Sequence, residues 1–60
     1  MTKGQVLALA AKMREIAVDM RILNRDDKLP FDTRYRAAVL ADHAEEVAEG
    51  AENLADRLDA

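Results

Sequence analysis

The 60-residue chain has no cysteine, one proline, two glycines and only two aromatic residues, Phe31 and Tyr35. The absence of cysteine excludes disulfide bonds and thiolate metal sites. With a single histidine, His43, the chain is too poor in nitrogen ligands for us to predict a metal site. Domains this small that lack disulfides and metals are usually stabilised by oligomerisation. We therefore expect the chain to assemble with itself.

The chain also lacks serine, so neither serine nor cysteine can act as a nucleophile. We expect Thr2 and Thr33 to cap helices, and we predict no catalytic residue, no cofactor and no small-molecule substrate. The longest uncharged run, residues 4–11, is far shorter than the roughly 18 residues that span a bilayer. We therefore predict no membrane contact and a cytoplasmic location.

Alanine, leucine, valine and charged residues dominate the composition, which is typical of an all-α protein. In the second half, six alanines recur at steps of four and three residues: Ala37, Ala41, Ala44, Ala48, Ala51 and Ala55. A row of larger side chains runs beside them: Leu40, Val47, Leu54 and Leu58. On a helix these ten positions fill one arc about 140° wide. The alanine edge of this arc predicts that another helix packs unusually close.

The first half begins with a capping box, in which Thr2 is the N-cap and Gln5 follows three residues later. A heptad pattern of apolar residues follows: Val6, Leu9, Met13, Ile16, Met20 and Leu23. Ala10 and Ala17 widen this stripe. It predicts a helix over about residues 3–24 whose heptad stripe is the inner face.

Polar residues and Pro30 separate the two helical patterns, and Asp32 or Thr33 is expected to cap a second helix over about residues 32–58. The short connection predicts a single domain, residues 1–60, folded as an antiparallel helical hairpin that dimerises into a four-helix bundle. The predicted core of the hairpin and dimer comprises Val6, Leu9, Met13, Ile16, Met20, Leu23, Leu40, Ala44, Val47, Ala51, Leu54 and Leu58.

A second set of apolar residues in the first helix, Leu7, Ala11, Val18 and Ile22, projects roughly opposite the heptad stripe. Two interpretations remain open. These residues are either isolated exposed aliphatics, which are normal on soluble proteins, or a docking surface for another protomer or a protein partner, centred on Leu7, Val18 and Ile22.

Charge is divided unevenly along the chain, with net +2 over residues 1–28 and net −5 over residues 29–60. Basic residues gather on one side of the first helix, and Glu45, Glu49, Glu52 and Asp56 form a stripe on the second. We favour pairing of these opposite charges across the bundle, with the basic first helix against the acidic second helix. The alternatives are a basic stripe that binds phosphates or an acidic stripe that binds a basic protein. The overall charge of −3 argues against a general nucleic-acid binder.

His43 lies at the edge of the apolar face of the second helix. As a metal ligand it would need Glu46 and further carboxylates, but Glu46 is predicted to point away from the core. We therefore favour a partly buried, hydrogen-bonded histidine at a subunit contact.

Several residues resemble the Rop (repressor of primer) family of plasmid copy-number regulators. The shared residues are Met1-Thr2-Lys3, Ala8-Leu9, Leu40, Asp42-His43-Ala44 and Glu46. The resemblance implies an antiparallel homodimeric four-helix bundle that binds paired RNA loops through the first helix. Lys3 matches the RNA-binding face of that family and Arg25 is a conservative replacement. Ala10, Arg14 and Val18 replace its aromatic and amide contacts, so the fold transfers better than the function.

Three functional hypotheses follow from the sequence. The first is a small, non-enzymatic, homodimeric module with a regulatory or accessory role through protein binding. The second is a Rop-like RNA-binding regulator that uses Lys3, Arg14, Arg21 and Arg25. The third is a purely structural or engineered helical bundle.

Overall fold

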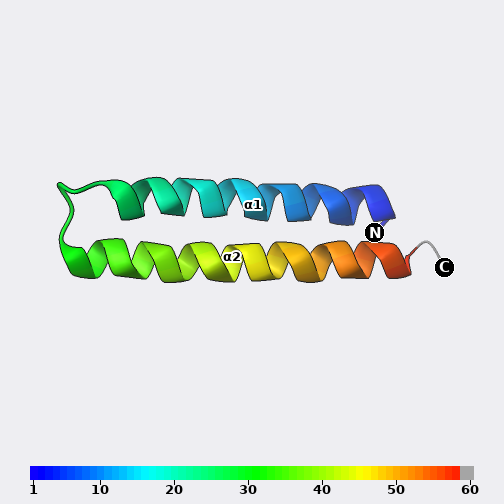
Figure 1. Ribbon diagram of the computed structural model, residues 1–60. Helices are drawn as coiled ribbons and strands as arrows, with labels where there is room; N and C mark the ends of the chain where they lie inside the picture. The colour runs from blue at the N-terminus through cyan, green and yellow to red at the C-terminus, as the bar shows by residue number, and fades with distance from the viewer. Residues whose placement is uncertain (59–60) are drawn as a thin grey trace.

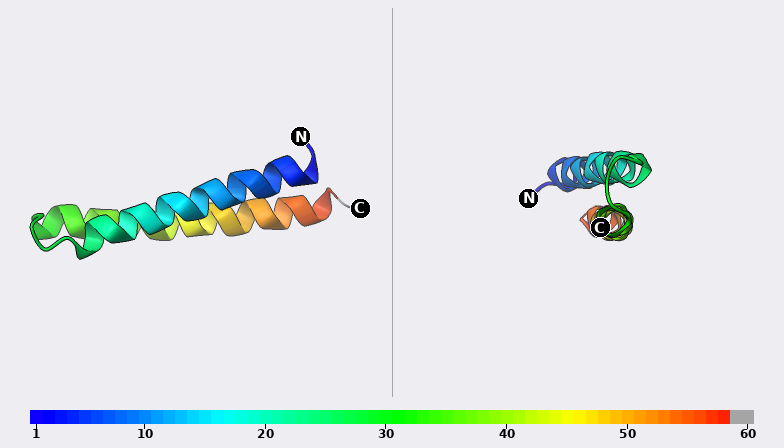
Figure 2. Two further views of the ribbon diagram at one scale, coloured as in Figure 1. Left: turned by 90° about the horizontal axis from the view of Figure 1, so that it is seen from above. Right: turned by 90° about the vertical axis from the view of Figure 1, so that its left-hand side faces the viewer.

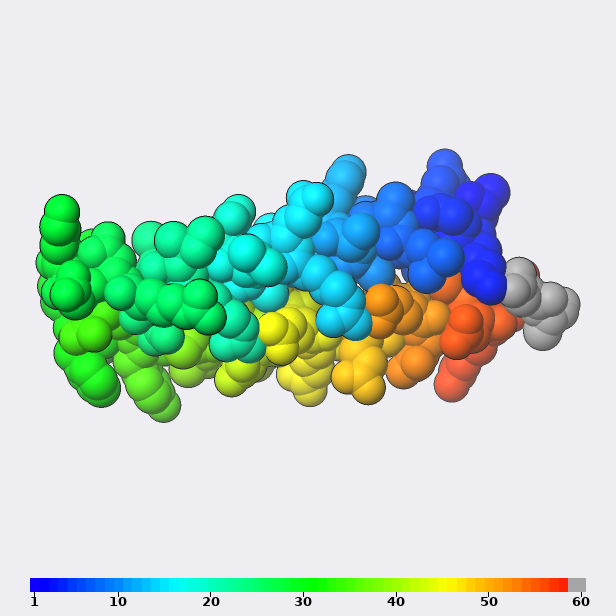
Figure 3. Space-filling view, turned by 45° about the horizontal axis from the view of Figure 1, so that its top comes forward, coloured from blue at the N-terminus to red at the C-terminus, as the bar shows by residue number. Residues whose placement is uncertain are grey.

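The computed structural model describes residues 1–58, which form two antiparallel helices, α1 (Lys3–Arg25) and α2 (Phe31–Arg57) (Figure 1). The predicted all-α hairpin is therefore confirmed, and the helix ends agree with the prediction to within one residue. The molecule is a rod with principal dimensions of 47 × 13 × 12 Å. Its helices run beside each other along most of their length (Figure 2), and their side chains meet to form one continuous surface (Figure 3).

The predicted capping box begins α1. The backbone amide of Gln5 donates to Thr2 Oγ1 at 3.2 Å, and the Thr2 amide donates to Gln5 Oε1 at 2.8 Å. After α1 ends, Asp26 holds the turn, because its carboxylate accepts the Lys28 amide at 3.0 Å and its carbonyl accepts the Leu29 amide at 3.1 Å. These bonds satisfy backbone groups that the helices leave unpaired.

The start of α2 differs from the prediction. Its N-cap is Pro30, which makes no side-chain capping bond, so the prediction that Asp32 or Thr33 caps the helix is wrong. Proline has no N–H to satisfy, and its φ of −57° already suits entry into a helix. The helix therefore begins at Phe31, one residue before the predicted start, and Asp32 lies in its first turn. A carboxylate there is favourable for the helix dipole.

Alanines form the centre of the interface between the helices. Five members of the α2 row are buried and Ala51 is half-buried; the buried ones are Ala37, Ala41, Ala44, Ala48 and Ala55. The α1 side consists of Val6, Ala10 and Ala17, and Ala17 clusters with Ala41 and Ala44. The prediction that the alanine row packs against another helix is confirmed.

The heptad stripe of α1 does not form the centre of the hairpin interface. Within the predicted core only Val6 and Ala44 are buried, and Met13, Met20 and Ala51 are half-buried. The other seven are exposed: Leu9, Ile16, Leu23, Leu40, Val47, Leu54 and Leu58. Ala17 of α1 clusters with Ala41 and Ala44 of α2, and the larger side chains lie exposed beside this contact. As a hairpin core these seven were predicted wrongly; as a dimer core they stay a prediction.

Candidate interaction surface

One flank of the alanine interface is an apolar face formed by both helices. We define the apolar face as Leu9, Met13, Ile16, Met20 and Leu23 of α1 with Leu40, Val47, Leu54 and Leu58 of α2. Its larger members are strongly exposed, for example Leu40 at 54% and Val47 at 55%. Contiguous exposed apolar surface of this kind marks interaction sites on soluble proteins.

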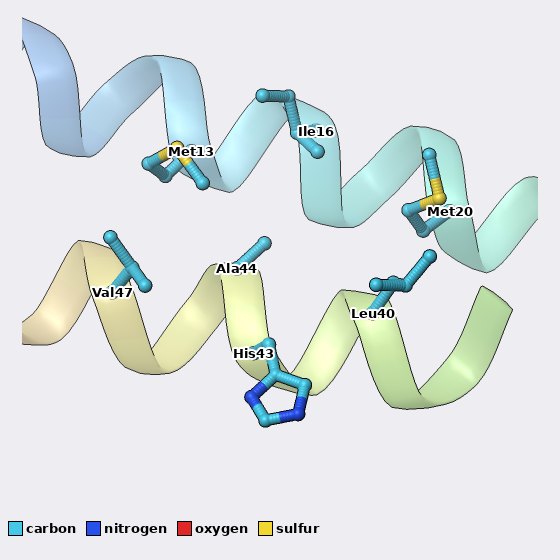
Figure 4. A pocket seen from close by; sticks show the side chains of 7 residues that line it. All are labelled: Met13, Ile16, Met20, Leu40, His43, Ala44 and Val47. Carbon is cyan, nitrogen blue, oxygen red and sulfur yellow. The ribbon is translucent and has the colours of Figure 1, made fainter. Parts of the chain in front are cut away.

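A shallow hollow of about 240 Å³ lies in the middle of the apolar face. Ala44 forms its floor because its neighbours have longer side chains, and Leu40 and Val47 border it along α2 (Figure 4). Met13, Ile16 and Met20 of α1 and His43 of α2 complete the lining. With His43 as the one polar side chain in it, the hollow suits an apolar side chain more than a polar ligand.

The opposite flank of the alanine interface is charged. Arg14 and Arg21 project about 140–160° away from Ile16 around α1. Arg14 forms an ion pair with Glu52, and Arg21 Nη2 donates to Glu45 at 2.8 Å and to Asp42 at 3.1 Å. The predicted pairing of the basic first helix with the acidic second helix is confirmed for these residues within the hairpin. The two flanks therefore differ completely in chemistry.

These ion pairs shift the pKa values of Arg14, Arg21 and Glu52. The hydrogen bond from Arg14 is the main cause that lowers the pKa of Glu52, and slight burial opposes it. The same bond raises the pKa of Arg14. Hydrogen bonds to Glu45 and then Asp42 raise the pKa of Arg21. The hydrogen bond between Arg14 and Glu52 therefore stabilises the ionised forms of both side chains.

The four predicted RNA contacts do not form one available basic stripe. Arg14 and Arg21 hold carboxylates of α2, Lys3 is half-buried in the first turn of α1, and Arg25 is exposed at its last turn. Carboxylates beside Arg14 and Arg21 weaken the positive potential that would attract phosphates. RNA binding through Lys3, Arg14, Arg21 and Arg25 stays a prediction.

The predicted partner face on α1 is exposed. Leu7 is 40% exposed, and Val18 and Ile22 are each 59% exposed. These residues lie away from the apolar face around the helix, so covering the apolar face would leave them accessible. A protein partner for this surface stays a prediction.

His43 is more exposed than the sequence suggested. Its side chain is 68% exposed, and Nδ1 lies 3.8 Å from Glu46 Oε2, too far for a hydrogen bond. Within one hairpin the imidazole is therefore neither buried nor hydrogen-bonded to Glu46, and a partly buried, hydrogen-bonded histidine at a subunit contact stays a prediction. Its place beside the hollow keeps it next to any molecule that covers the apolar face.

Two kinds of feature, a metal-ion site and a membrane-spanning helix, are considered next for residues 1–58, the range that the structure describes. In that range, no three histidine or acidic side chains are grouped closely enough to hold a metal ion. In the same range, neither helix combines the length and the apolar character that crossing a membrane requires.

The contact between the two aromatic residues at the hairpin turn was not predicted from the sequence. Phe31 and Tyr35 stack with ring centroids 6.3 Å apart, and the guanidinium of Arg34 lies 5.9 Å from the centroid of Phe31. Their spacing of four residues at the start of a helix was the available signal.

Comparison of the chain with protein-family models, with curated proteins and with solved structures found no match.

Proposed function

We propose that this chain is a non-enzymatic, homodimeric helical-hairpin module with a regulatory or accessory role through protein binding. The apolar face of one copy covers that of a second copy, which produces a four-helix bundle. The observation that supports the proposal is the exposure of seven large aliphatic residues on one flank of the hairpin. In a four-helix bundle, residues at these heptad positions form the core.

The total surface supports a partner of this size. The hairpin exposes 4576 Å². A compact monomer of its mass, 6.7 kDa, exposes about 3,900 Å². The excess of about 700 Å² is close to the roughly 800 Å² that each partner buries in a standard interface. One further hairpin docked on the apolar face accounts for it.

The role through protein binding is supported by the surface that a dimer leaves uncovered. Leu7, Val18 and Ile22 remain exposed on the outside of α1 in such a bundle. A dimer presents this surface twice, which increases the avidity for a partner that has two sites. The module then acts by holding partners together, and it needs no catalytic group.

The dimer is tested by sedimentation equilibrium of the purified protein and of the variant Val47→Glu. The wild type is expected to have twice the mass of the chain. The variant is expected to be monomeric at the same concentration, because the dimer would bury a carboxylate without a partner. A monomeric wild type would overturn the proposal.

Val18→Glu is the matched control, because Val18 is 59% exposed and Val47 is 55% exposed. The control places the same charge on the outside of α1, and it is expected to remain dimeric. If Val18→Glu dissociates the dimer and Val47→Glu does not, the dimer uses the outside of α1 and the assignment of the apolar face is wrong.

A further inference from the structure

We propose that the second copy docks with both hairpin turns at the same end of the bundle, so that α1 of each copy lies on α2 of the other. This inference rests on the proposed dimer. A two-fold axis in the interface can run parallel to the helices, which gives this arrangement. It can also run across them, which places the turns at opposite ends and stacks α1 on α1 and α2 on α2.

A two-fold axis parallel to the helices does not shift residues along the bundle, so each residue and its counterpart in the second copy lie at the same height. The heights can then be taken from the hairpin itself, where Ala17 clusters with Ala41 and Ala44. Ala17 is therefore level with about residues 42–43 of α2, and each step along α1 corresponds to one step back along α2. The same correspondence applies between α1 of the second copy and α2 of the first.

At these heights the side chains of the two copies interdigitate. Ile16 of the second copy is level with about residues 43–44, between Leu40 and Val47. This position is the hollow above Ala44. Seven residues away on each helix, Leu9 of the second copy falls between Val47 and Leu54. Each large side chain of one copy thus meets a gap in the other, as in knobs-into-holes packing.

Packing alone does not distinguish the two arrangements, because hairpins with their turns at opposite ends can slide along each other until their side chains also interdigitate. The residues along the two outer edges of the apolar face, which we call its rims, do distinguish the arrangements. The α2 rim consists of Arg36, His43, Gly50 and Arg57 at steps of seven, and it contains no carboxylate. The α1 rim consists of Gln5, Lys12 and Asp19, followed by Asp26 where α1 ends.

When the turns lie at the same end, the α2 rim faces the α1 rim of the second copy. Asp19 of that copy is then about two residues, or roughly 3 Å, from the height of His43. Asp26 has the same relation to Arg36, which among residues 1–58 of its own copy pairs with Asp32. Lys12 falls beside Gly50, which has no side chain and where an added Cβ would meet no neighbouring side chain within 4 Å, so there is open space next to it.

When the turns lie at opposite ends, the α2 rim of one copy faces the α2 rim of the other copy. Interdigitation then brings Arg36 to within about two residues of the height of the second copy's Arg57, and the like charges repel. Lys12 and Asp19 remain the one attractive pair between the α1 rims. Glu46 Oε2 lies 3.8 Å from His43 Nδ1, so the positive charge of the α2 rim is carried by Arg36 and Arg57. Charge therefore favours the arrangement with the turns at the same end, which differs from the antiparallel dimer that the Rop resemblance implies.

The arrangement is tested by measuring the distance between two nitroxide labels, one in each copy. Lys28→Cys places the label in the turn, and it is the sole cysteine because the chain has none. Turns at the same end are expected to give about 15–25 Å, from helix separations of 8–10 Å and the label arms. Turns at opposite ends would give about 40 Å, the length of α2, and would overturn this inference while leaving the dimer intact. A monomeric mass with no dipolar signal would instead overturn the proposed dimer.

Charge exchange provides an independent test. Asp19→Lys is expected to weaken dimerisation roughly two- to fivefold, because it places a cation beside the α2 rim, whose charged residues are Arg36 and Arg57. Adding His43→Glu should restore the affinity, because it creates a pair of opposite charges between the copies. The matched double variant Asp19→Lys with Lys12→Glu should not restore it. The reverse result, restoration by Lys12→Glu alone, would place the turns at opposite ends and overturn the inference.

Discussion

Glu52 is the carboxylate whose pKa the fold lowers, through the hydrogen bond from Arg14. Because its pKa is lower in the folded than in the unfolded chain, the ion pair stabilises the fold above the ordinary carboxylate pKa and loses this effect as pH falls through the folded value. We expect the free energy of unfolding to fall as the pH decreases below about 4.5, and Glu52→Gln to reduce this dependence. Urea unfolding at neutral and acid pH measures both.

Glu15→Gln is the control for this variant, since Glu15 is exposed and makes no ion pair in the described residues. It should keep the wild-type dependence on pH. Equal pH profiles for Glu52→Gln and the wild type would show that the Arg14–Glu52 pair contributes nothing to stability, which is the outcome for many exposed ion pairs.

At the scale of the helix, the alanine row allows α1 and α2 to pack closely. Ala41 is fully buried in this row and clusters with Ala17 of α1. Ala41→Leu adds three carbon atoms where no space exists, so it should lower the free energy of unfolding by about 1–3 kcal/mol. Urea unfolding monitored by circular dichroism measures the change. Ala11→Leu makes the same substitution at an exposed position of α1 and should have little effect. Equal effects of the two variants would mean that the helices do not pack closely at Ala41.

Local patterns predicted the helices well. The capping box at Thr2 and the break before Pro30 determine where α1 starts and where the chain turns, and the steps of three and four show which side of α2 contains alanine. The first residue of α2 was harder to predict, because Pro30 competes with Asp32 and Thr33 as the boundary and the better side-chain cap is not the one used.

The orientation of α1 about its own axis could not be predicted from its sequence. Leu9 and Ile16 make the strongest heptad pattern, yet Ala10 and Ala17 face α2. Periodicity gives an apolar arc but does not divide it between two contacts. In this chain the alanines form the contact within the hairpin, and the larger residues are left exposed for a second contact.

The groups that Arg14 and Arg21 contact could not be predicted from the sequence either. Their spacing suits both a phosphate-binding stripe and pairing with α2, and only the three-dimensional arrangement shows their bonds to Glu52, Glu45 and Asp42. Residue patterns predicted which side chains compose the surfaces, whereas the packing of the helices determined what each surface contacts.

At the scale of the whole molecule, the hairpin has a small core for its length. Among the described residues, the buried ones are Val6 and seven alanines, and no large side chain is fully buried. Alanine contributes little apolar area, so burial within one hairpin offsets only part of the conformational entropy lost on folding. Most of the large aliphatic side chains are on the apolar face, where they stabilise the fold only if a second copy covers them.

The stability of the module should therefore depend on its concentration. Dimerisation couples to folding by mass action, so the melting temperature should rise steadily as the protein is concentrated from about 1 µM to about 100 µM. Thermal unfolding followed by circular dichroism at 222 nm measures this dependence. Val47→Glu, which blocks the apolar face, should melt at a lower temperature that does not change over the same range. A wild-type melting temperature independent of concentration would show that the hairpin is stable alone, and the apolar face would then have no part in holding the fold together.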